Sequence, residues 1–439
     1  MGKVFNTFGG GNNKRLVSIT VDTMPTKTTY SVGDALDYTG IKVVANFSDM
    51  TSADVTDSCV YSPAEGTLVT SGLSSVSVSY QGVGTSFPIS IINIYGIQRD
   101  ITNSNPVYTR TDNAVGKTFS ASVGSTAGHS DFDNCMPWAG MVRETIGSDV
   151  MVKIPKFWFK RWLDGNIEHI QIADGPATGF AVHPMFMYGQ TECDEIYVGA
   201  YHTASGYVSQ TGKAPLVNIT RAAARTGSVN KGSGWSQLDF SANCGIILLA
   251  LVETASNNIQ VTVGRGNVDQ ASSATPLNSG SCDSVPNLTG RPSGTDGKTG
   301  VVYRGIENLW GNVWQWVDGI NMNGATPYIC LDPSKYADDT SANYTQLSYN
   351  IGSTSYSQSY ISRIGLDENN PFAIMPTQAS GSETTYYCDA IWSSTGWRVC
   401  RRGGRWDDGG CCGLFTVRVH DVSSDAYSYI GARLLYRPI

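Results

Sequence analysis

Cysteine, histidine and acidic side chains gather near the end of the chain, in the segment 401–438. Cys411 and Cys412 are adjacent, and so are His420 and Asp421. Thiolate, imidazole and carboxylate groups are ligands that zinc prefers, and cysteine and histidine also act as nucleophile and base. Three kinds of site therefore have to be weighed: a metal site, a catalytic site and a ligand-binding face.

The spacing argues against a metal site. Neighbouring residues of a strand point to opposite faces, so Cys411 and Cys412 cannot both reach one ion from an extended chain, and the same holds for His420 and Asp421. A closed zinc site needs three or four ligands around one point. The other histidines, which follow no ligand spacing, are His129, His169, His183 and His202. We therefore expect no metal and no cofactor.

A ligand-binding face fits the same residues better. Ordinary framework residues recur through the segment, among them Gly403, Gly404, Trp406, Gly413, Phe415 and Gly431. The side chains between these framework residues share no chemical type. Arg418 and His420 are two residues apart, as are Tyr427 and Tyr429, and this spacing places each pair on one face of an extended chain. Tyrosines on such a face would be rigid anchors, as in antibody loops. The predicted face comprises Arg405, Asp407, Asp408, Cys411, Cys412, Leu414, Arg418, His420, Asp421, Asp425, Tyr427 and Tyr429.

The composition indicates a loop-rich, mainly β protein. The chain has 439 residues, long enough for two or three domains. It includes 48 Gly, 22 Tyr and 10 Trp, and only 15% of its residues are charged, a composition that is typical of β proteins. The net charge of −7 and the absence of a Lys/Arg run disfavour nucleic-acid binding. The most apolar run, 244–252, is too short to cross a bilayer, and no signal-peptide core follows Met1, so we expect neither membrane insertion nor export by the usual route.

Residues 15–93 are expected to form an immunoglobulin-like β-sandwich. Val17, Ile19 and Val21 alternate with polar residues, and short strands recur between Gly, Asp and Pro turns. The stretches PTKTTYSVGDALDYTGIKVVANFSD and VSVSYQGVGTSFPISI resemble the bacterial immunoglobulin-like domains of surface and phage proteins, which implies a spacer or attachment role. We predict a flexible leader at 1–14 and a polar linker at 94–130.

Residues 131–439 are expected to form one dense, aromatic α+β domain. Helices are predicted at 219–226 and 235–256, and the tryptophans of GIENLWGNVWQWVDG (305–319) are interpreted as core. GNVWQW resembles the GNVWEW element of the formylglycine-generating enzyme family, and GWRVCRRGGRW and IGARLLY resemble the strands that end such domains. IPKFWFK, GFAVHPMF and EIYVGAY fit its earlier strands. The resemblance implies a C-type-lectin-like fold.

An oxidase of that family is the alternative function. Its copper chemistry needs two catalytic cysteines a few residues apart in the C-terminal region. Cys411 and Cys412 are adjacent and do not match that spacing, so no catalytic residue is carried over and we do not expect an enzyme.

The same family contains the variable proteins of diversity-generating retroelements, including phage tropism determinants. There, adenines of a template are copied with errors, and AAY codons become NNY codons, which cannot encode Lys, Glu, Gln, Met or Trp. The whole chain has 43 residues of the first four types, yet residues 384–439 have none, where about five or six would be expected from its own composition. Trp397 and Trp406 then belong to the framework, and the variable region spans about 400–430.

The resemblance implies an adhesion protein. It would be a phage tail-fibre receptor-binding protein, carried at the virion tip, whose variable face binds a bacterial surface receptor, either protein or glycan. The resemblance also implies a homotrimer that contacts other virion tail proteins through its N-terminal region. A bacterial cell-surface adhesin is the other non-enzymatic hypothesis.

Overall fold

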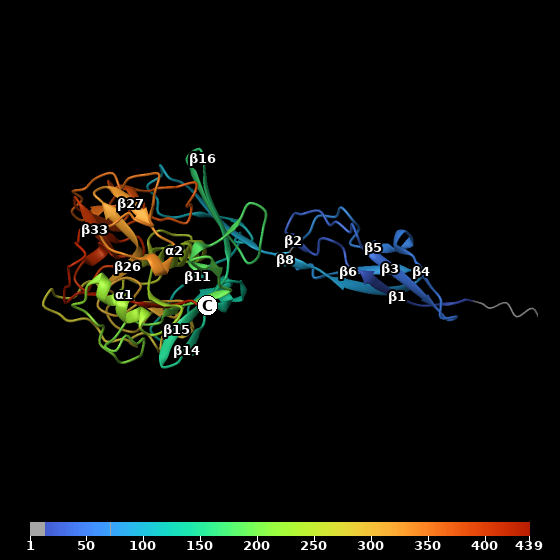
Figure 1. The fold of residues 1–439 in the computed structure, drawn as a ribbon, viewed down its shortest axis with the longest axis horizontal. Coiled ribbons are helices and arrows are strands. Elements are labelled where there is room, and N and C mark those ends of the chain that lie inside the picture. The colour runs from blue at the N-terminus through green and yellow to red at the C-terminus, as the bar shows by residue number, and fades with distance from the viewer. Residues whose placement is uncertain (1–13, 71) are drawn as a thin grey trace, which may run out of the picture. The chain divides into compact units, whose positions relative to one another are not determined.

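The computed structural model describes residues 14–70 and 72–439, so the predicted leader at 1–14 lies outside the described residues except for Lys14. The chain divides into two compact units, Met1–Ile94 and Tyr95–Ile439 (Figure 1). Within the described ranges, no helix is long and apolar enough to cross a membrane.

The smaller unit is built from short strands, as predicted, and most of them pair in antiparallel fashion. One sheet holds β1 (Leu16–Thr23), β3 (Lys42–Phe47) and β4 (Ser52–Asp54), and another holds β5 (Val60–Ser62), β6 (Ser75–Tyr80) and β7 (Val83–Pro88). β2 (Thr29–Ser31) pairs in parallel with β8 (Ser90–Ile92). The alternating residues Ile19, Val43, Val76 and Phe87 are buried in one core, because successive side chains of a strand point to opposite faces.

The predicted linker at 94–130 is wrong, because this segment belongs to the larger unit. β9 (Ile94–Asp100) and β10 (Thr109–Asp112) lie in a sheet of order β10-β9-β17-β16-β18. Tyr95 and Ile97 are buried in the main core. The alternation of the buried residues Tyr95 and Ile97 was not recognised in the sequence, because the segment is rich in polar Ser, Thr and Asn residues. The sheet is completed by β17 (Ile167–Ala173), β16 (Trp158–Asp164) and β18 (Ala181–Val182).

A second five-stranded sheet joins the end of the chain to much earlier strands. Its order is β14 (Arg143–Ile146), β15 (Asp149–Pro155), β21 (Glu195–Gly199), β36 (Leu434–Tyr436) and β22 (Trp235–Gln237). The last strand, β36, therefore lies between β21 and β22. This closure of the chain end against an early strand, together with two helices, is the α+β arrangement that the sequence resemblance implied.

The largest sheet carries the closing segment. Its order is β28 (Thr345–Gln346), β27 (Thr326–Ile329), β26 (Trp314–Asn323), β33 (Trp397–Arg402), β34 (Val417–Val419), β32 (Ala390–Ser393) and β29 (Ser359–Tyr360), with β35 (Ile430–Gly431) beside β26. Smaller pairings involve β11 (Phe119–Ser120), β13 (His129–Ser130), β12 (Ser122–Val123), β23 (Gly290–Arg291), β24 (Val302–Tyr303), β25 (Ile306–Glu307), β19 (Met187–Tyr188), β20 (Thr191–Glu192), β30 (Arg363–Ile364) and β31 (Pro376–Gln378).

Both predicted helices are present, with shifted bounds. α1 (Arg221–Val229) is capped by the Thr220 side chain, and α2 (Phe240–Thr254) by Asp239, which accepts a hydrogen bond from the Ala242 amide at 2.9 Å. The residues predicted to begin the second helix form β22 instead, because they pair with β36. α2 is buried almost all round, and a short α3 (Ile259–Thr262) follows.

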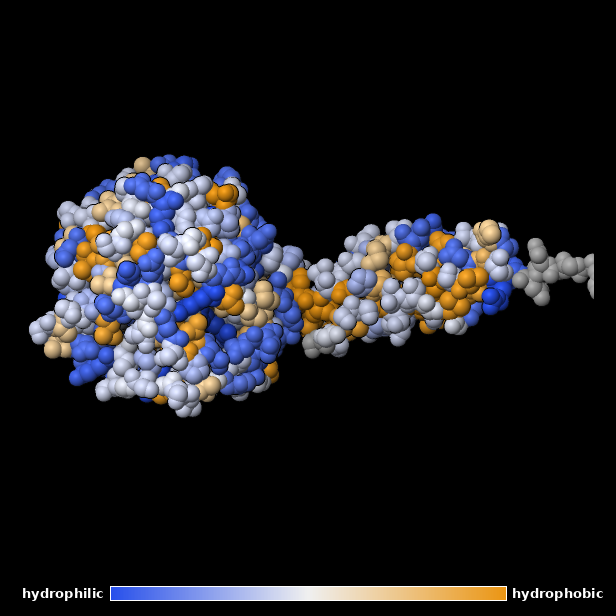
Figure 2. Space-filling view, turned by 90° about the horizontal axis from the view of Figure 1, so that it is seen from below, coloured by the Kyte–Doolittle hydropathy of each residue, from blue (hydrophilic) through white to orange (hydrophobic). Residues whose placement is uncertain are grey.

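The tryptophan-rich segment lies in the core, as predicted. Trp310, Trp314 and Trp316 are at most 1% exposed. Gly311 allows the tight turn between the first two, because its φ is +75° and a Cβ there would lie 2.9 Å from the Asn267 carbonyl oxygen. On the surface of the larger unit, hydrophilic and hydrophobic side chains are interspersed over the side that Figure 2 presents.

Candidate recognition face

The segment 403–429 runs mostly in turns, and its stretch 411–417 is buried. β34 is a strand, and a 3-10 turn spans Gly409–Cys411, but the remainder is irregular. Tyr427 and Tyr429 therefore do not alternate on an extended chain, and that part of the prediction is wrong. They are nonetheless side by side, because their rings stack with 5.2 Å between centroids and 4° between planes.

Eight of the twelve predicted residues are exposed or half-buried. We call them the C-terminal face: Arg405, Asp407, Asp408, Arg418, His420, Asp425, Tyr427 and Tyr429.

The other four predicted residues are buried, so their placement on an open face is wrong. Cys411 and Cys412 pack in an apolar cluster with Trp314, and Leu414 lies in the main core. Asp421 is 3% exposed beneath the surface. A chain that runs in turns sends side chains inward without the period of two that a strand would impose.

Tyr429 contacts two other residues of the C-terminal face, Arg405 and Tyr427. The Arg405 guanidinium lies 4.2 Å from its ring centroid, within cation–π range, and the Arg405 Nε lies 2.6 Å from Asp407 Oδ1. Tyr427, stacked on Tyr429, donates its hydroxyl proton to Asp425 Oδ1 at 3.2 Å. The charge of Asp425 raises the pKa of Tyr427. These contacts hold the aromatic rings in fixed positions.

A buried ion pair lies beneath the face. Arg401 of β33 is fully buried, and its Nε lies 3.0 Å from Asp421 Oδ2. The same carboxylate oxygen lies 3.8 Å from Arg418 Nε. The Arg401 guanidinium also lies 5.0 Å from the Trp314 ring and 5.5 Å from the Tyr429 ring. Burial lowers the pKa of Arg401 to about 10, so the group stays charged at neutral pH.

The sequence did not point to several residues that support the face. The ring centroid of Trp392, a residue of β32, lies 5.5 Å from the Arg418 guanidinium carbon. The Asn218 amide donates to the Tyr427 carbonyl at 3.0 Å, and Asp339 accepts from the Ser423 hydroxyl. These residues come from distant parts of the chain, so no local pattern could reveal them. Arg401 carried no signal of its own either, because it is one of three arginines in β33.

The cysteines of this region are poorly placed for nucleophilic chemistry. Burial raises the pKa of Cys412 above its usual range, and raises that of Cys388 to about 12, which disfavours the reactive thiolate. In the part of the chain that the structure describes, no group of three or more His, Cys, Asp or Glu side chains could hold a metal ion. The side chains of the C-terminal face can therefore offer a ligand hydrogen bonds, charges and aromatic ring surfaces.

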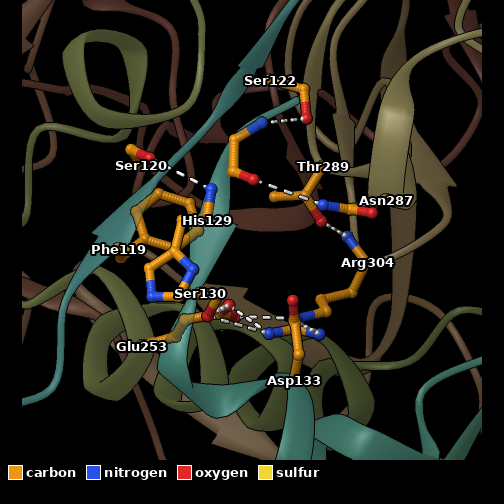
Figure 3. Close-up of a pocket in the computed structure, with 11 residues that line it drawn as sticks. Phe119, Ser120, Ser122, His129, Ser130, Asp133, Glu253, Asn287, Thr289 and Arg304 are labelled. Atoms are coloured by element: carbon orange, nitrogen blue, oxygen red, sulfur yellow. Dashed lines mark hydrogen bonds and ion pairs between the residues drawn. The ribbon is translucent and has the colours of Figure 1, made fainter. Parts of the chain in front are cut away.

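A polar cluster elsewhere in the larger unit is structural (Figure 3). Arg304 donates from Nε to Glu253 Oε2 at 3.0 Å, and its Nη1 lies 2.7 Å from Asp133 Oδ1. Tyr303 and Ser130 also donate to Glu253, at 2.8 and 2.7 Å. The cavity beside them has a volume of about 10 Å³, room for a single water at most. The network therefore ties α2 to neighbouring strands.

A wider groove of about 480 Å³ runs along β16. Trp162, one of the residues that line the groove, stacks on His169 with 4.5 Å between ring centroids, and the Lys160 ammonium lies 4.5 Å from the Trp162 ring centroid. The ring already has two partners within the chain, so it is not a free platform for a ligand.

Comparison with known proteins assigns the smaller unit. Residues 23–91 match the family model described as bacterial Ig-like domain (group 3). The smaller unit is a bacterial immunoglobulin-like domain. This confirms the fold predicted for that segment, and the match does not extend to the larger unit.

The chain is also similar to solved structures titled Major Tropism Determinant. The P3c variant has a TM-score of 0.28 and 8% identity, with 84% of this chain and 82% of that chain covered. The I1 variant has a TM-score of 0.28 and 9% identity, with 94% and 99% covered. No curated protein sequence matches the chain. Both TM-scores are well below 0.5, so these structures carry no conclusion about the function of this chain.

Proposed function

We propose that this chain is a non-enzymatic receptor-binding protein and that the C-terminal face contacts the receptor. One observation carries the proposal: six of the eight residues of the face are linked to one another by ring stacking, a cation–π contact, a hydrogen bond and ion pairs, above a framework of buried tryptophans. These six are Arg405, Asp407, Asp408, Asp425, Tyr427 and Tyr429. Exposed Tyr and Arg side chains with restricted motion are the residues that dominate binding interfaces.

The composition of the closing segment supports diversification by a retroelement. Residues 384–439 lack the four residue types Lys, Glu, Gln and Met, and Trp397 and Trp406 are framework. The structure adds a physical constraint: variation is tolerable at the eight exposed or half-buried positions and costly at the four buried ones, because core substitutions change packing.

We propose further that the protein is carried on a phage tail fibre as a homotrimer and binds a bacterial surface receptor. The face is smaller than the roughly 20–30 residues a side of a standard protein interface, so one copy would bind weakly. Several linked copies raise avidity by about 10²–10⁴ without new contacts. The immunoglobulin-like unit would serve as a spacer or as the attachment to other tail proteins. A monomer by light scattering at micromolar concentration would contradict the trimer.

The double variant Tyr427→Ala/Tyr429→Ala tests the function. Strains that bind the fluorescently labelled parent are first identified from a bacterial panel, and the variant should lose that binding while light scattering shows an unchanged oligomer. Tyr188→Ala, which removes a half-buried tyrosine outside the face, is the matched control and should bind as the parent does. A double variant that still binds would contradict the proposal, as would a parent that binds no strain.

A further inference from the structure

The outer edge of β16 is only partly paired. On one side, β17 pairs with every residue of β16, from Trp158 to Asp164. On the other side, the two-residue strand β18 pairs only with Trp158 and Phe159. The chain that leads into β18 lies in a turn, in which the Phe180 amide donates to the Ala177 carbonyl at 3.0 Å. Among the described strands, none therefore covers the edge of β16 beyond Phe159.

Arg161 and Leu163 present their backbone groups at this edge. Alternate residues of an antiparallel strand direct their N–H and C=O groups to the same neighbouring strand. The Phe157 carbonyl accepts from the His183 amide at 3.2 Å, on the side of β18. The backbone groups of Phe159, Arg161 and Leu163 therefore point to that side as well. Within the described chain, the N–H and C=O groups of Arg161 and Leu163 have no backbone partner there.

The groove of about 480 Å³ along β16 lies at this edge and not on a face of the sheet. It is lined by the consecutive residues Phe159–Leu163, whose side chains alternate between the two faces, and by no residue of β17. A hollow on one face of the sheet would be lined by alternate residues of β16 and by the neighbouring strand. The other lining residues are Gly179, Ala181, Leu366, Glu368 and Pro371.

The loop that follows β30 supplies part of the groove wall and is held in place. The buried Arg161 guanidinium donates to the carbonyls of Gly365 and Ala373, both at 3.1 Å. The Asp367 carboxylate accepts from the Asn370 amide at 3.0 Å. The groove is therefore formed before a ligand arrives, which lowers the entropic cost of binding.

The groove lining favours an uncharged, extended polypeptide. Arg161 is paired with Glu168, whose Oε1 lies 2.7 Å from Arg161 Nη2. The other charged lining residues, Lys160 and Glu368, carry opposite charges. Leu163 is 41% exposed and offers apolar contact. A row of unpaired backbone donors and acceptors inside a groove is the arrangement that an added strand completes.

We propose that this groove binds an extended, uncharged segment of a partner protein, which adds to the sheet as a strand in line with β18. The backbone groups of Arg161 and Leu163 would form hydrogen bonds with its main chain, which supply the affinity in this mode of recognition. The groove shares no residue with the C-terminal face, so this second interface goes beyond the proposed function.

Titration calorimetry on the full chain tests the groove with the hexapeptide acetyl-Thr-Val-Thr-Val-Thr-Val-amide. The matched control peptide has the same side chains but is N-methylated at every residue, so it cannot donate to a strand. We expect the first peptide to bind and the methylated one to bind at least about tenfold more weakly, because its main-chain hydrogen bonds are lost. Hydrogen exchange in residues 158–164 should slow with the first peptide only.

Leu163→Pro tests the same edge from the side of the protein. It removes a backbone donor that points into the groove and leaves the pairing with β17, because proline is tolerated where the amide of an edge strand faces outward. Binding of the unmethylated hexapeptide should weaken about fivefold. Leu163→Ala, which shortens the side chain and keeps the donor, should weaken it less.

Several results would overturn the proposal. Equal binding of the two hexapeptides, or no binding of either, excludes an added strand, as does unchanged hydrogen exchange in 158–164. A folded Leu163→Pro variant that binds as tightly as the parent does so too, and the methylated peptide decides the matter if that variant does not fold. Tighter binding of the hexapeptide KVFNTF, the sequence of residues 3–8, would replace the partner protein by a segment of this chain itself.

Discussion

Replacing Asp421 by Asn should destabilise the larger unit far more than its place in the closing segment suggests. The substitution leaves Arg401, which is 0% exposed, without the carboxylate that lies 3.0 Å from its Nε. Removing one partner of a buried ion pair typically costs about 3–5 kcal/mol, because the other charge stays buried and uncompensated. Arg418 Nε lies 3.8 Å from the same oxygen, so the substitution removes the negative charge that two cations share.

Urea unfolding followed by tryptophan fluorescence measures this cost. All 10 tryptophans lie in the larger unit, between Trp138 and Trp406, so the signal reports that unit alone. Asp425→Asn, a matched change at a half-buried aspartate of the face, should cost under about 1 kcal/mol. The double variant Arg401→Met/Asp421→Asn removes both charges and should regain part of the loss, since apolar replacement of a buried pair is often neutral. Equal costs for Asp421→Asn and Asp425→Asn would refute the reasoning, as would a double variant whose cost is the sum of the two single costs.

Three further predictions concern stability, pH and metals. Trp314→Ala should cost about 3–5 kcal/mol of unfolding free energy, the range for large core truncations, while Tyr427→Ala should cost under about 1 kcal/mol; similar losses would place Tyr427 in the core. His183 and His202 are buried and their pKa values are lowered by burial, that of His183 to about 3. As the pH falls, both histidines therefore become protonated in the unfolded chain at a higher pH than in the folded protein. The free energy of unfolding should fall as the pH drops from about 6.5 towards 3, by about 1.4 kcal/mol per histidine and pH unit. A variant with both histidines replaced by Gln that shows the same dependence of unfolding free energy on pH would contradict this. Cell binding should survive a chelator, and a stoichiometric transition metal lost together with binding would contradict that expectation.

The sequence was most informative where a feature depends on the period of neighbouring residues. The alternation of Val17, Ile19 and Val21 predicted strands, and the apolar residues within 235–256 predicted a helix, which the structure places at Phe240–Thr254. The tryptophans at 310–316 were correctly interpreted as core because no other side chain buries more area. These features depend on neighbouring residues alone.

The errors arose where the decisive partner is distant in the chain. Residues 94–130 looked like a linker because their strand partners, such as β17, lie far away. Cys411, Cys412 and Leu414 looked exposed because an extended chain was assumed, whereas turns direct them inward against the core. Asp421 looked like a surface acid because nothing near it in sequence identifies Arg401 as its buried partner.

Sequencing the DNA that flanks the gene tests the central claim most directly. If the C-terminal face is diversified for receptor binding, a near-copy of codons 400–430 should lie beside a reverse-transcriptase gene, and should differ from the gene only at adenines of the copy. The differences should fall on the codons of the eight exposed or half-buried face residues and spare Trp406 and Arg401. A flank without such a copy, or differences spread equally over the buried framework codons, would contradict the account.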